Sequence, residues 1–172
     1  MTAAAHSFDL GSLQLEPGQG RRLDLTVPIE PLRFGGERYS VVPPSLVVSL
    51  DVSCTTGPGW ALRVRFTAVL EGPCMRCLDP AAPAVVVDAR EVDQPAGGEE
   101  LSSPYLDEQV LDLAALARDS LVLAIPPQLV CSSDCAGLCA VCGINLNHAG
   151  PDHQHERPPD PRWAKLRELR LE

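Results

Sequence analysis

The sequence predicts an α+β fold: a mostly antiparallel sheet of about four to five strands, one helix packed on it, and a C-terminal appendage with a short helix. Four segments alternate apolar and polar residues, as half-buried strands do. A later segment repeats apolar residues at three-to-four residue spacing, as an amphipathic helix does. Cysteines and histidines are concentrated near the C-terminus. We therefore divide the chain into a core of residues 1–130 and a Cys/His-rich tail of residues 131–172 packed on it.

The composition is that of an ordinary globular protein. Of 172 residues, 45% are hydrophobic and 22% are charged, so the chain can bury a core. No apolar run reaches the roughly 18 residues of a membrane helix, and the first ten residues resemble no secretory signal, so we expect a cytoplasmic protein without a membrane partner. The net charge of -9 argues against a surface covered in phosphate-binding cations.

Each of the four predicted strands is bounded by turn-forming residues. The first alternates Leu23, Leu25 and Val27 with polar neighbours, and the turn TTGPG joins the second and third strands in a hairpin. A loop containing Cys74 and Cys77 separates the third strand from the fourth, so this pair is held at the end of the sheet. The four segments are residues 21–29, 45–54, 59–72 and 82–92.

Two helices are expected after the strands. An acidic, exposed connector at residues 94–104 leads to the first helix, which Asp112 caps and which covers residues 113–124 with one apolar side. Pro126 and Pro127 end this helix. A short terminal helix begins near Asp160 and carries Trp163, Leu166 and Leu169 on one side.

The spacing of the cysteines indicates metal binding. A reducing cytosol keeps thiols free, so clustered cysteines there are more often metal ligands than disulfides. Cys74 and Cys77 form one CxxC pair, and Cys139 and Cys142 form another. This spacing lets two thiolates reach one zinc ion at about 2.3 Å. Gly143 can adopt the positive φ that turns backbone N–H groups toward the sulfurs.

A count of ligands favours two zinc ions. A closed structural zinc site takes four protein ligands, and the chain offers eight in its clustered segments. We expect Cys74, Cys77, Cys131 and Cys135 around one ion and Cys139, Cys142, His153 and His155 around the other. Two alternatives are a single ion shared by both CxxC pairs, and a site made of the four cysteines between residues 131 and 142. Cys54 is left over as a small apolar residue of the second strand, and His6 and His148 are not expected to be ligands.

Four motifs together resemble one family. CMRC after a long strand, LDLAALARDSLVLAIPP, CSSDCAGLCAVCGINLN and DPRWAKL are similar, in this order, to the bacterial, metal-binding large ribosomal RNA subunit accumulation protein (YceD-like) family. The resemblance covers residues 46–170 and implies a role in 23S rRNA accumulation. In many members of this family a CxC motif stands where this chain has His153 and His155. The resemblance therefore implies that these histidines substitute for ligand cysteines. The matching positions are Cys74, Arg76, Cys77, Cys135, Gly137, Leu138, Cys139, Cys142, Gly143, Asp160, Pro161 and Arg162.

The sequence favours a binding protein over an enzyme. A catalytic zinc usually keeps an open position, whereas thiolate-rich sites are closed. Our first hypothesis is a zinc-binding accessory protein of large-subunit ribosome biogenesis that binds ribosomal RNA, a large-subunit ribosomal protein or an assembly factor, and no small-molecule substrate. RNA would contact the face of Arg63 and Arg65 or the C-terminal basic residues, and a basic protein would contact the acidic connector. The alternatives are a thiol redox sensor or zinc-releasing switch and, third, a metal-dependent hydrolase that uses Glu156.

Overall fold

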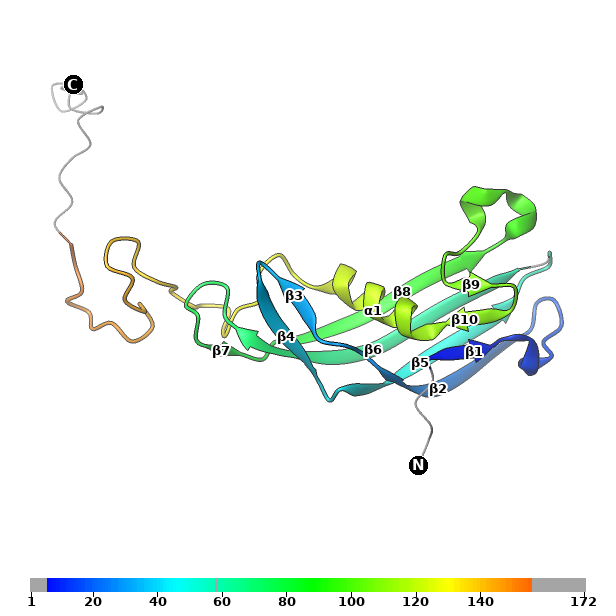
Figure 1. Ribbon diagram of the computed structural model, residues 1–172, viewed down its shortest axis with the longest axis horizontal. Helices are drawn as coiled ribbons and strands as arrows, with labels where there is room; N and C mark the ends of the chain where they lie inside the picture. The colour runs from blue at the N-terminus through cyan, green and yellow to red at the C-terminus, as the bar shows by residue number, and fades with distance from the viewer. Residues whose placement is uncertain (1–5, 58, 156–172) are drawn as a thin grey trace, which may run out of the picture.

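The computed structural model describes residues 6–57 and 59–155, which form an elongated molecule built on a long twisted sheet (Figure 1). This part of the chain contains ten strands, one α-helix and three 3-10 turns. The strands are β1 (Ser7–Asp9), β2 (Gly20–Pro28), β3 (Leu32–Phe34), β4 (Glu37–Val42), β5 (Ser45–Cys54), β6 (Trp60–Pro73), β7 (Pro80–Ala81), β8 (Ala84–Asp93), β9 (Leu106–Asp107) and β10 (Val110–Asp112). The helix is α1 (Leu113–Ala124), and the 3-10 turns are η1 (Gly11–Leu13), η2 (Pro95–Gly97) and η3 (Glu99–Leu101).

The 14-residue strand β6 organises the larger sheet. Seven strands belong to this sheet, in the order β2-β5-β6-β4-β3, and β7 and β8 also pair with β6. All pairings are antiparallel. The first half of β6 lies between β5 and β8, and its last residues pair with β4 and then β7. One continuous strand therefore connects the core to the loop that begins at Cys74.

The core lies between one face of the sheet and α1. Leu, Val and Phe side chains of β5, β6 and β8 alternate toward this face and are buried with the apolar side of the helix. Leu113, Leu116, Ala117 and Leu121 of α1 are all in this cluster. Burial of one fully enclosed leucine stabilises the fold by about 1.5–3 kcal/mol.

The opposite face of the sheet is open and carries paired charges. Arg63 of β6 donates two hydrogen bonds to the carboxylate of Asp88 on β8, both of 2.6 Å. Arg65 is 2.8 Å from Asp51 of β5, which also pairs with Arg22 of β2. The arginines that the sequence offered as an RNA-binding face are thus largely paired with neighbouring carboxylates.

The prediction of an α+β fold with four to five strands is wrong. The described residues are mostly β, with seven strands in the large antiparallel sheet, three in a small sheet of order β1-β10-β9, and one α-helix. The four long strands that were expected are present as β2, β5, β6 and β8. The strands that were missed have two to six residues. Segments this short give little alternation, and tertiary pairing determines their conformation.

The helix was predicted correctly. α1 begins after Asp112, whose side chain accepts a hydrogen bond of 2.9 Å from the backbone N–H of Ala115. The expected terminal helix from Asp160 lies outside the described residues. No helix within the described part of the chain is both long enough and apolar enough to cross a membrane.

Candidate metal centres

The structure brings the eight predicted ligands together in two groups of four. Within each group, the sulfur or ring nitrogen atoms that could bind a metal all lie within 4.8 Å of one another. The first cluster consists of Cys74, Cys77, Cys131 and Cys135, and the second cluster consists of Cys139, Cys142, His153 and His155.

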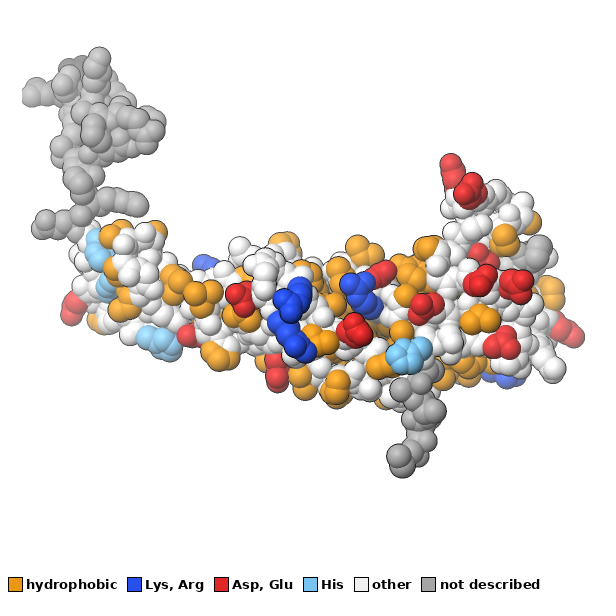
Figure 2. All heavy atoms as spheres, in the orientation of Figure 1, with side chains coloured by type: hydrophobic (Ala, Val, Ile, Leu, Met, Phe, Trp, Pro, Cys, Tyr) orange, Lys and Arg blue, Asp and Glu red, His pale blue; other side chains and the backbone are white. Residues whose placement is uncertain are grey.

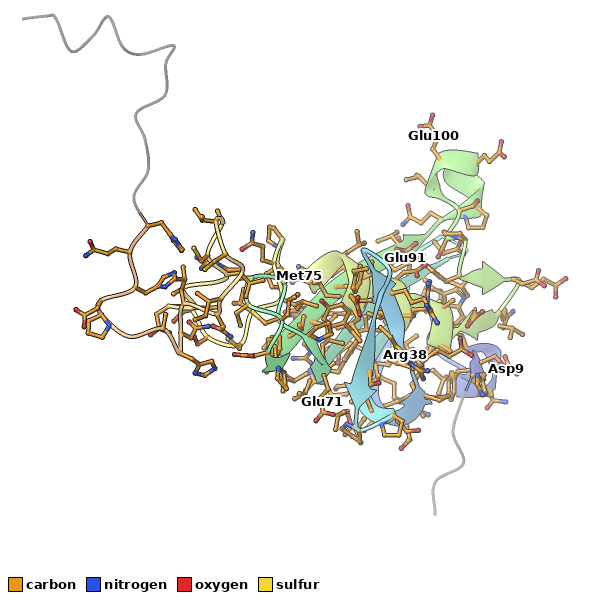
Figure 3. All side chains as sticks on the ribbon, turned by 60° about the vertical axis from the view of Figure 1, so that its left-hand side comes forward. Asp9, Arg38, Glu71, Met75, Glu91 and Glu100 are labelled. Carbon is orange, nitrogen blue, oxygen red and sulfur yellow. The ribbon has the colours of Figure 1, made fainter. Side chains whose placement is uncertain are left out.

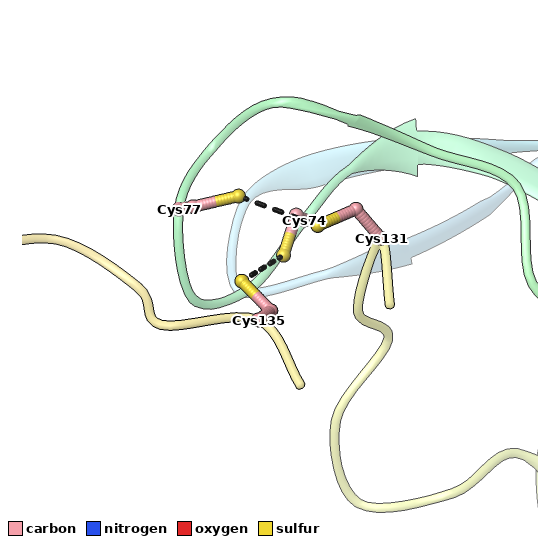
Figure 4. A group of neighbouring side chains, drawn as sticks. All are labelled: Cys74, Cys77, Cys131 and Cys135. Carbon is pink, nitrogen blue, oxygen red and sulfur yellow. Dashed lines mark hydrogen bonds between the residues drawn. The ribbon is translucent and has the colours of Figure 1, made fainter. Parts of the chain in front are cut away.

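The first cluster joins two segments that are far apart in the sequence. Cys74 directly follows Pro73, the last residue of β6, and Cys77 lies in the same loop before β7. Cys131 and Cys135 come from the segment after α1, which passes beside this loop (Figure 4). Because β6 is fixed in the sheet, its end presents Cys74 and Cys77 to the returning chain in a defined position.

Sulfur separations in the first cluster match a tetrahedral metal site. The Sγ atoms of Cys74 and Cys135 are 3.8 Å apart, and those of Cys77 and Cys131 are 3.6 Å apart. A disulfide would require about 2.05 Å. Four sulfurs at about 2.3 Å from a tetrahedral zinc ion are about 3.8 Å from one another. These separations are compatible with one tetrahedral ion, and all four cysteines are free thiols in the structure.

The thiols of the first cluster differ in how easily they ionise. Burial of the Cys74 thiol opposes its ionisation, but backbone N–H groups, including that of Arg76 at 3.4 Å, lower its pKa to about 6. Burial raises the pKa of the nearby Cys77 thiol to about 12, and the neighbouring thiols add to this effect. A bound metal ion would favour the thiolate form of all four cysteines, because its positive charge compensates theirs.

Backbone contacts hold the two segments together beside the sulfurs. The N–H of Met75 donates to the carbonyl oxygen of Leu129 at 2.8 Å, and the N–H of Leu129 is 3.4 Å from the Met75 sulfur. Figure 3 shows Met75 where the loop meets the tail. Leu129 is fully buried in the core. The approach of this segment to the CxxC loop is therefore held by backbone contacts and by the packing of Leu129.

Two asparagines that the sequence analysis did not select support the first cluster. The Asn145 side chain donates to the Asp79 carboxylate at 2.6 Å. The Asn147 side chain donates to Cys135 Sγ at 3.5 Å and lowers the pKa of that thiol, and its oxygen accepts from the N–H of Ala136. The Asn-Leu-Asn sequence at residues 145–147, shortly after the second CxxC, was the available signal, since short amides commonly bond to nearby backbone.

The second cluster is built within the tail alone. Cys142 Sγ lies 3.2 Å from Nε2 of His155 and 3.7 Å from Nε2 of His153. Gly143 has a φ of 75° and donates its N–H to the Cys139 carbonyl at 2.9 Å, which closes the turn of the CxxC pair. The side chain of His153 lowers the pKa of the Cys139 thiol to about 6. Thiolates and imidazoles in this number form a donor set suited to zinc.

Three residues set apart in the sequence analysis lie outside both clusters. Cys54 ends β5 and is half-buried. His148 is 3.1 Å from Asp79 and makes this contact from an exposed position. His6 directly precedes β1, and neither cluster includes it.

Comparison with protein families matches residues 62–170 to the model of the large ribosomal RNA subunit accumulation protein YceD. This match covers well over half of the chain. The chain belongs to the YceD family. The match begins within β6 and includes all eight residues of the two clusters, so the strands before β6 lie outside the region that defines the YceD match.

Mycobacterial proteins are similar over nearly the whole chain. Uncharacterized proteins of Mycobacterium tuberculosis and Mycobacterium bovis are each 31% identical over 176 residues, covering 97% of this chain and 82% of the relative. An uncharacterized protein of Mycobacterium leprae is 29% identical over 169 residues, covering 94% of this chain and 76% of the relative. No solved structure matches the chain significantly.

Proposed function

We propose that this protein is a zinc-binding accessory factor of large ribosomal subunit biogenesis, which supports accumulation of 23S rRNA in the cytoplasm by binding and not by catalysis. Family membership supports the ribosomal role. The observation that carries the zinc proposal is the first cluster, where four sulfurs lie at separations suited to one tetrahedral ion. The second cluster would hold a second zinc ion with two thiolates and two imidazoles.

The proposed ions are structural. Four protein ligands complete a tetrahedral zinc site, so no position is left for a substrate or an activated water. In the first cluster, Cys74, Cys77 and Cys135 are 0%, 3% and 1% exposed. An ion there would fasten the tail of residues 131–172 to the core of residues 1–130, and binding energy of the ion becomes folding energy of the tail. The partner is ribosomal RNA, a large-subunit ribosomal protein or an assembly factor, without a membrane or a small-molecule substrate.

A combined test of metal content and cellular role addresses this proposal. Native mass spectrometry of the reduced protein is expected to show two zinc ions, which a chelator removes. In a bacterial strain without its own copy, the wild-type gene and Cys54→Ala should restore 23S rRNA accumulation, and Cys74→Ser should not. A metal-free, folded wild-type protein would disprove the zinc proposal. Restoration by a Cys74→Ser variant that lacks the ion of the first cluster would show that the ribosomal role does not need this ion.

The exposure of the second cluster favours a zinc-releasing redox switch as a second candidate function. Cys142 and His155 are both exposed, so an oxidant can reach the sulfur. Hydrogen peroxide would take two electrons from the thiolates of Cys139 and Cys142, which form a disulfide, while two protons and the peroxide yield two waters and the ion leaves. Stoichiometric zinc that persists under mild peroxide treatment would rule out this candidate.

A further inference from the structure

A cavity of about 350 Å³ lies at the end of the sheet opposite to the metal clusters. It opens between η1, the β9–β10 turn and the ends of β5, β6 and β8. Trp60, the first residue of β6, lines it, whereas Cys74 follows the other end of the same strand. A strand of this length spans roughly 40 Å. The cavity is thus separate from both clusters, and its volume is within the range of about 300–1,000 Å³ typical of ligand sites.

The lining of this cavity combines an aromatic ring with carboxylates. Asp93 is only 7% exposed, and one carboxylate oxygen accepts from the N–H of Ser103 at 2.9 Å. The other oxygen has no hydrogen-bond partner among the described residues. Glu108, exposed on the β9–β10 turn, is a second carboxylate, and no Lys or Arg is among the described lining residues. An indole face and an open carboxylate both attract a cation.

The surroundings of the cavity are also acidic. In Figure 2, Asp and Glu side chains gather over β9, β10 and the loop that contains η2 and η3. Figure 3 shows Asp9 and Glu100 at this end of the molecule. Further carboxylates of the neighbouring turns and strand ends are those of Glu16, Glu99 and Asp107. A mainly acidic surface raises the local concentration of positively charged partners and steers their approach.

We propose that this cavity binds a Lys or Arg side chain presented by a basic segment of a partner protein. Trp60 would contact the cation by its ring, Asp93 would accept a hydrogen bond from it, and Glu108 would close the site from the turn. Phosphates of RNA are repelled by the same carboxylates, which favours a protein partner at this end. The inference rests on the proposed function only in taking a large-subunit ribosomal protein or assembly factor as the source of the segment.

Fluorescence of Trp60 provides a direct readout. The chain has two tryptophans, so Trp163→Phe leaves Trp60 as the single reporter. A short peptide of alternating arginine and glycine, titrated into this full-length variant, is expected to change the Trp60 emission saturably, and added salt should weaken the binding. Calorimetry with the wild-type chain measures the same affinity without the Trp163 substitution. Absence of saturable binding at low salt would overturn the proposal.

Charge-neutral variants separate the cavity from the general acidity of the protein. Glu108→Gln changes an exposed side chain, and we expect it alone to weaken peptide binding severalfold. The double variant Asp93→Asn with Glu108→Gln should weaken it by about tenfold. The control is Glu71→Gln, which removes the same charge from an exposed position near the other end of β6 and should leave the affinity unchanged within about twofold. An equal loss in the control would overturn the proposal.

Two competitors decide the chemical class of the occupant. An RNA oligonucleotide should not displace the peptide from Trp60, and displacement would assign the cavity to RNA. Spermidine should compete weakly, and affinity equal to that of the peptide would assign the cavity to a free polyamine; either result overturns the protein-partner proposal. These measurements use purified protein and do not depend on the 23S rRNA assay. Failure of peptide binding with intact zinc content and rRNA accumulation would therefore reject the cavity alone.

Discussion

The two clusters use the same CxxC turn in different surroundings. The first cluster joins a loop of the sheet to a segment more than fifty residues later, and three of its cysteines pack in a buried group with Ala81. The second cluster draws its ligands from residues 139–155, and two of its four side chains are exposed. The comparison indicates that the first cluster links the sheet to a distant segment, whereas the second cluster lies within residues 139–155 alone.

The largest effect is expected from loss of a ligand in the first cluster. Cys74→Ser should reduce zinc from two ions to one and lower the free energy of unfolding by about 4 kcal/mol, because loss of a buried structural metal is among the most destabilising changes. Urea unfolding followed by circular dichroism, together with native mass spectrometry, measures both quantities. Cys54→Ala is the matched control and should retain both ions. Two ions retained by Cys74→Ser would remove this residue from the ligand set.

Loss of a ligand in the second cluster should have a local effect. Cys142→Ser is expected to lower the metal count from two to one while the unfolding free energy of the sheet changes by about 0.5 kcal/mol or less, since the side chain is exposed and away from the core. Amide hydrogen exchange should increase near Gly143 and remain slow in β5 and β6. Loss of both ions in this variant would mean that the eight ligands form one coupled cluster.

Chelation should distinguish the two clusters by rate. A chelator can reach the exposed Cys142 and His155 of the second cluster, whereas Cys131 is the one exposed ligand of the first cluster and its other three cysteines are buried. We therefore expect a species with one ion to accumulate during treatment, with the second cluster emptied first. A time course by native mass spectrometry measures this order. Simultaneous release of both ions would contradict the assignment of different stabilities.

The two groups of ligands were predicted from the spacing and the number of the cysteines and histidines, although the first group joins distant segments. CxxC pairs bring two sulfurs together in one turn, and the ligand count suggested the division that the structure shows in space. Binding of an ion by these groups stays a prediction. The supporting contacts were harder to foresee. The bond from Asn145 to Asp79 joins residues 66 positions apart and depends on how the tail returns to the loop, which local patterns do not contain.

The fold shows the same division between local and long-range information. The long strands β2, β5, β6 and β8 could be predicted from the alternation of apolar and polar residues. The start of α1 could be predicted from Asp112, which caps the helix. The short strand β4 was missed because its place is set by pairing of Ser40, Val41 and Val42 with the end of β6. Short strands that form by such long-range pairing make the described residues mostly β, in place of the α+β fold that was expected.

A backbone effect that leaves all eight ligands in place is expected at the residue that follows each CxxC pair. Leu78 and Gly143 occupy equivalent positions and both adopt positive φ, at 65° and 75°. Space around Gly143 is open, so Gly143→Ala adds no contact and should destabilise the tail by about 1 kcal/mol through backbone strain alone. Amide hydrogen exchange of residues 139–155, recorded at increasing temperature, measures this cost.

The reciprocal change at Leu78 should be close to neutral. Leu78→Gly relieves about 1 kcal/mol of left-handed strain, but glycine gains a similar amount of freedom in the unfolded chain, about 0.5–1 kcal/mol. The Leu78 side chain is 65% exposed, so little buried surface is lost. A destabilisation well above 1 kcal/mol in urea unfolding would show that this leucine contributes packing to the first cluster, and the two turns would then differ in more than their surroundings.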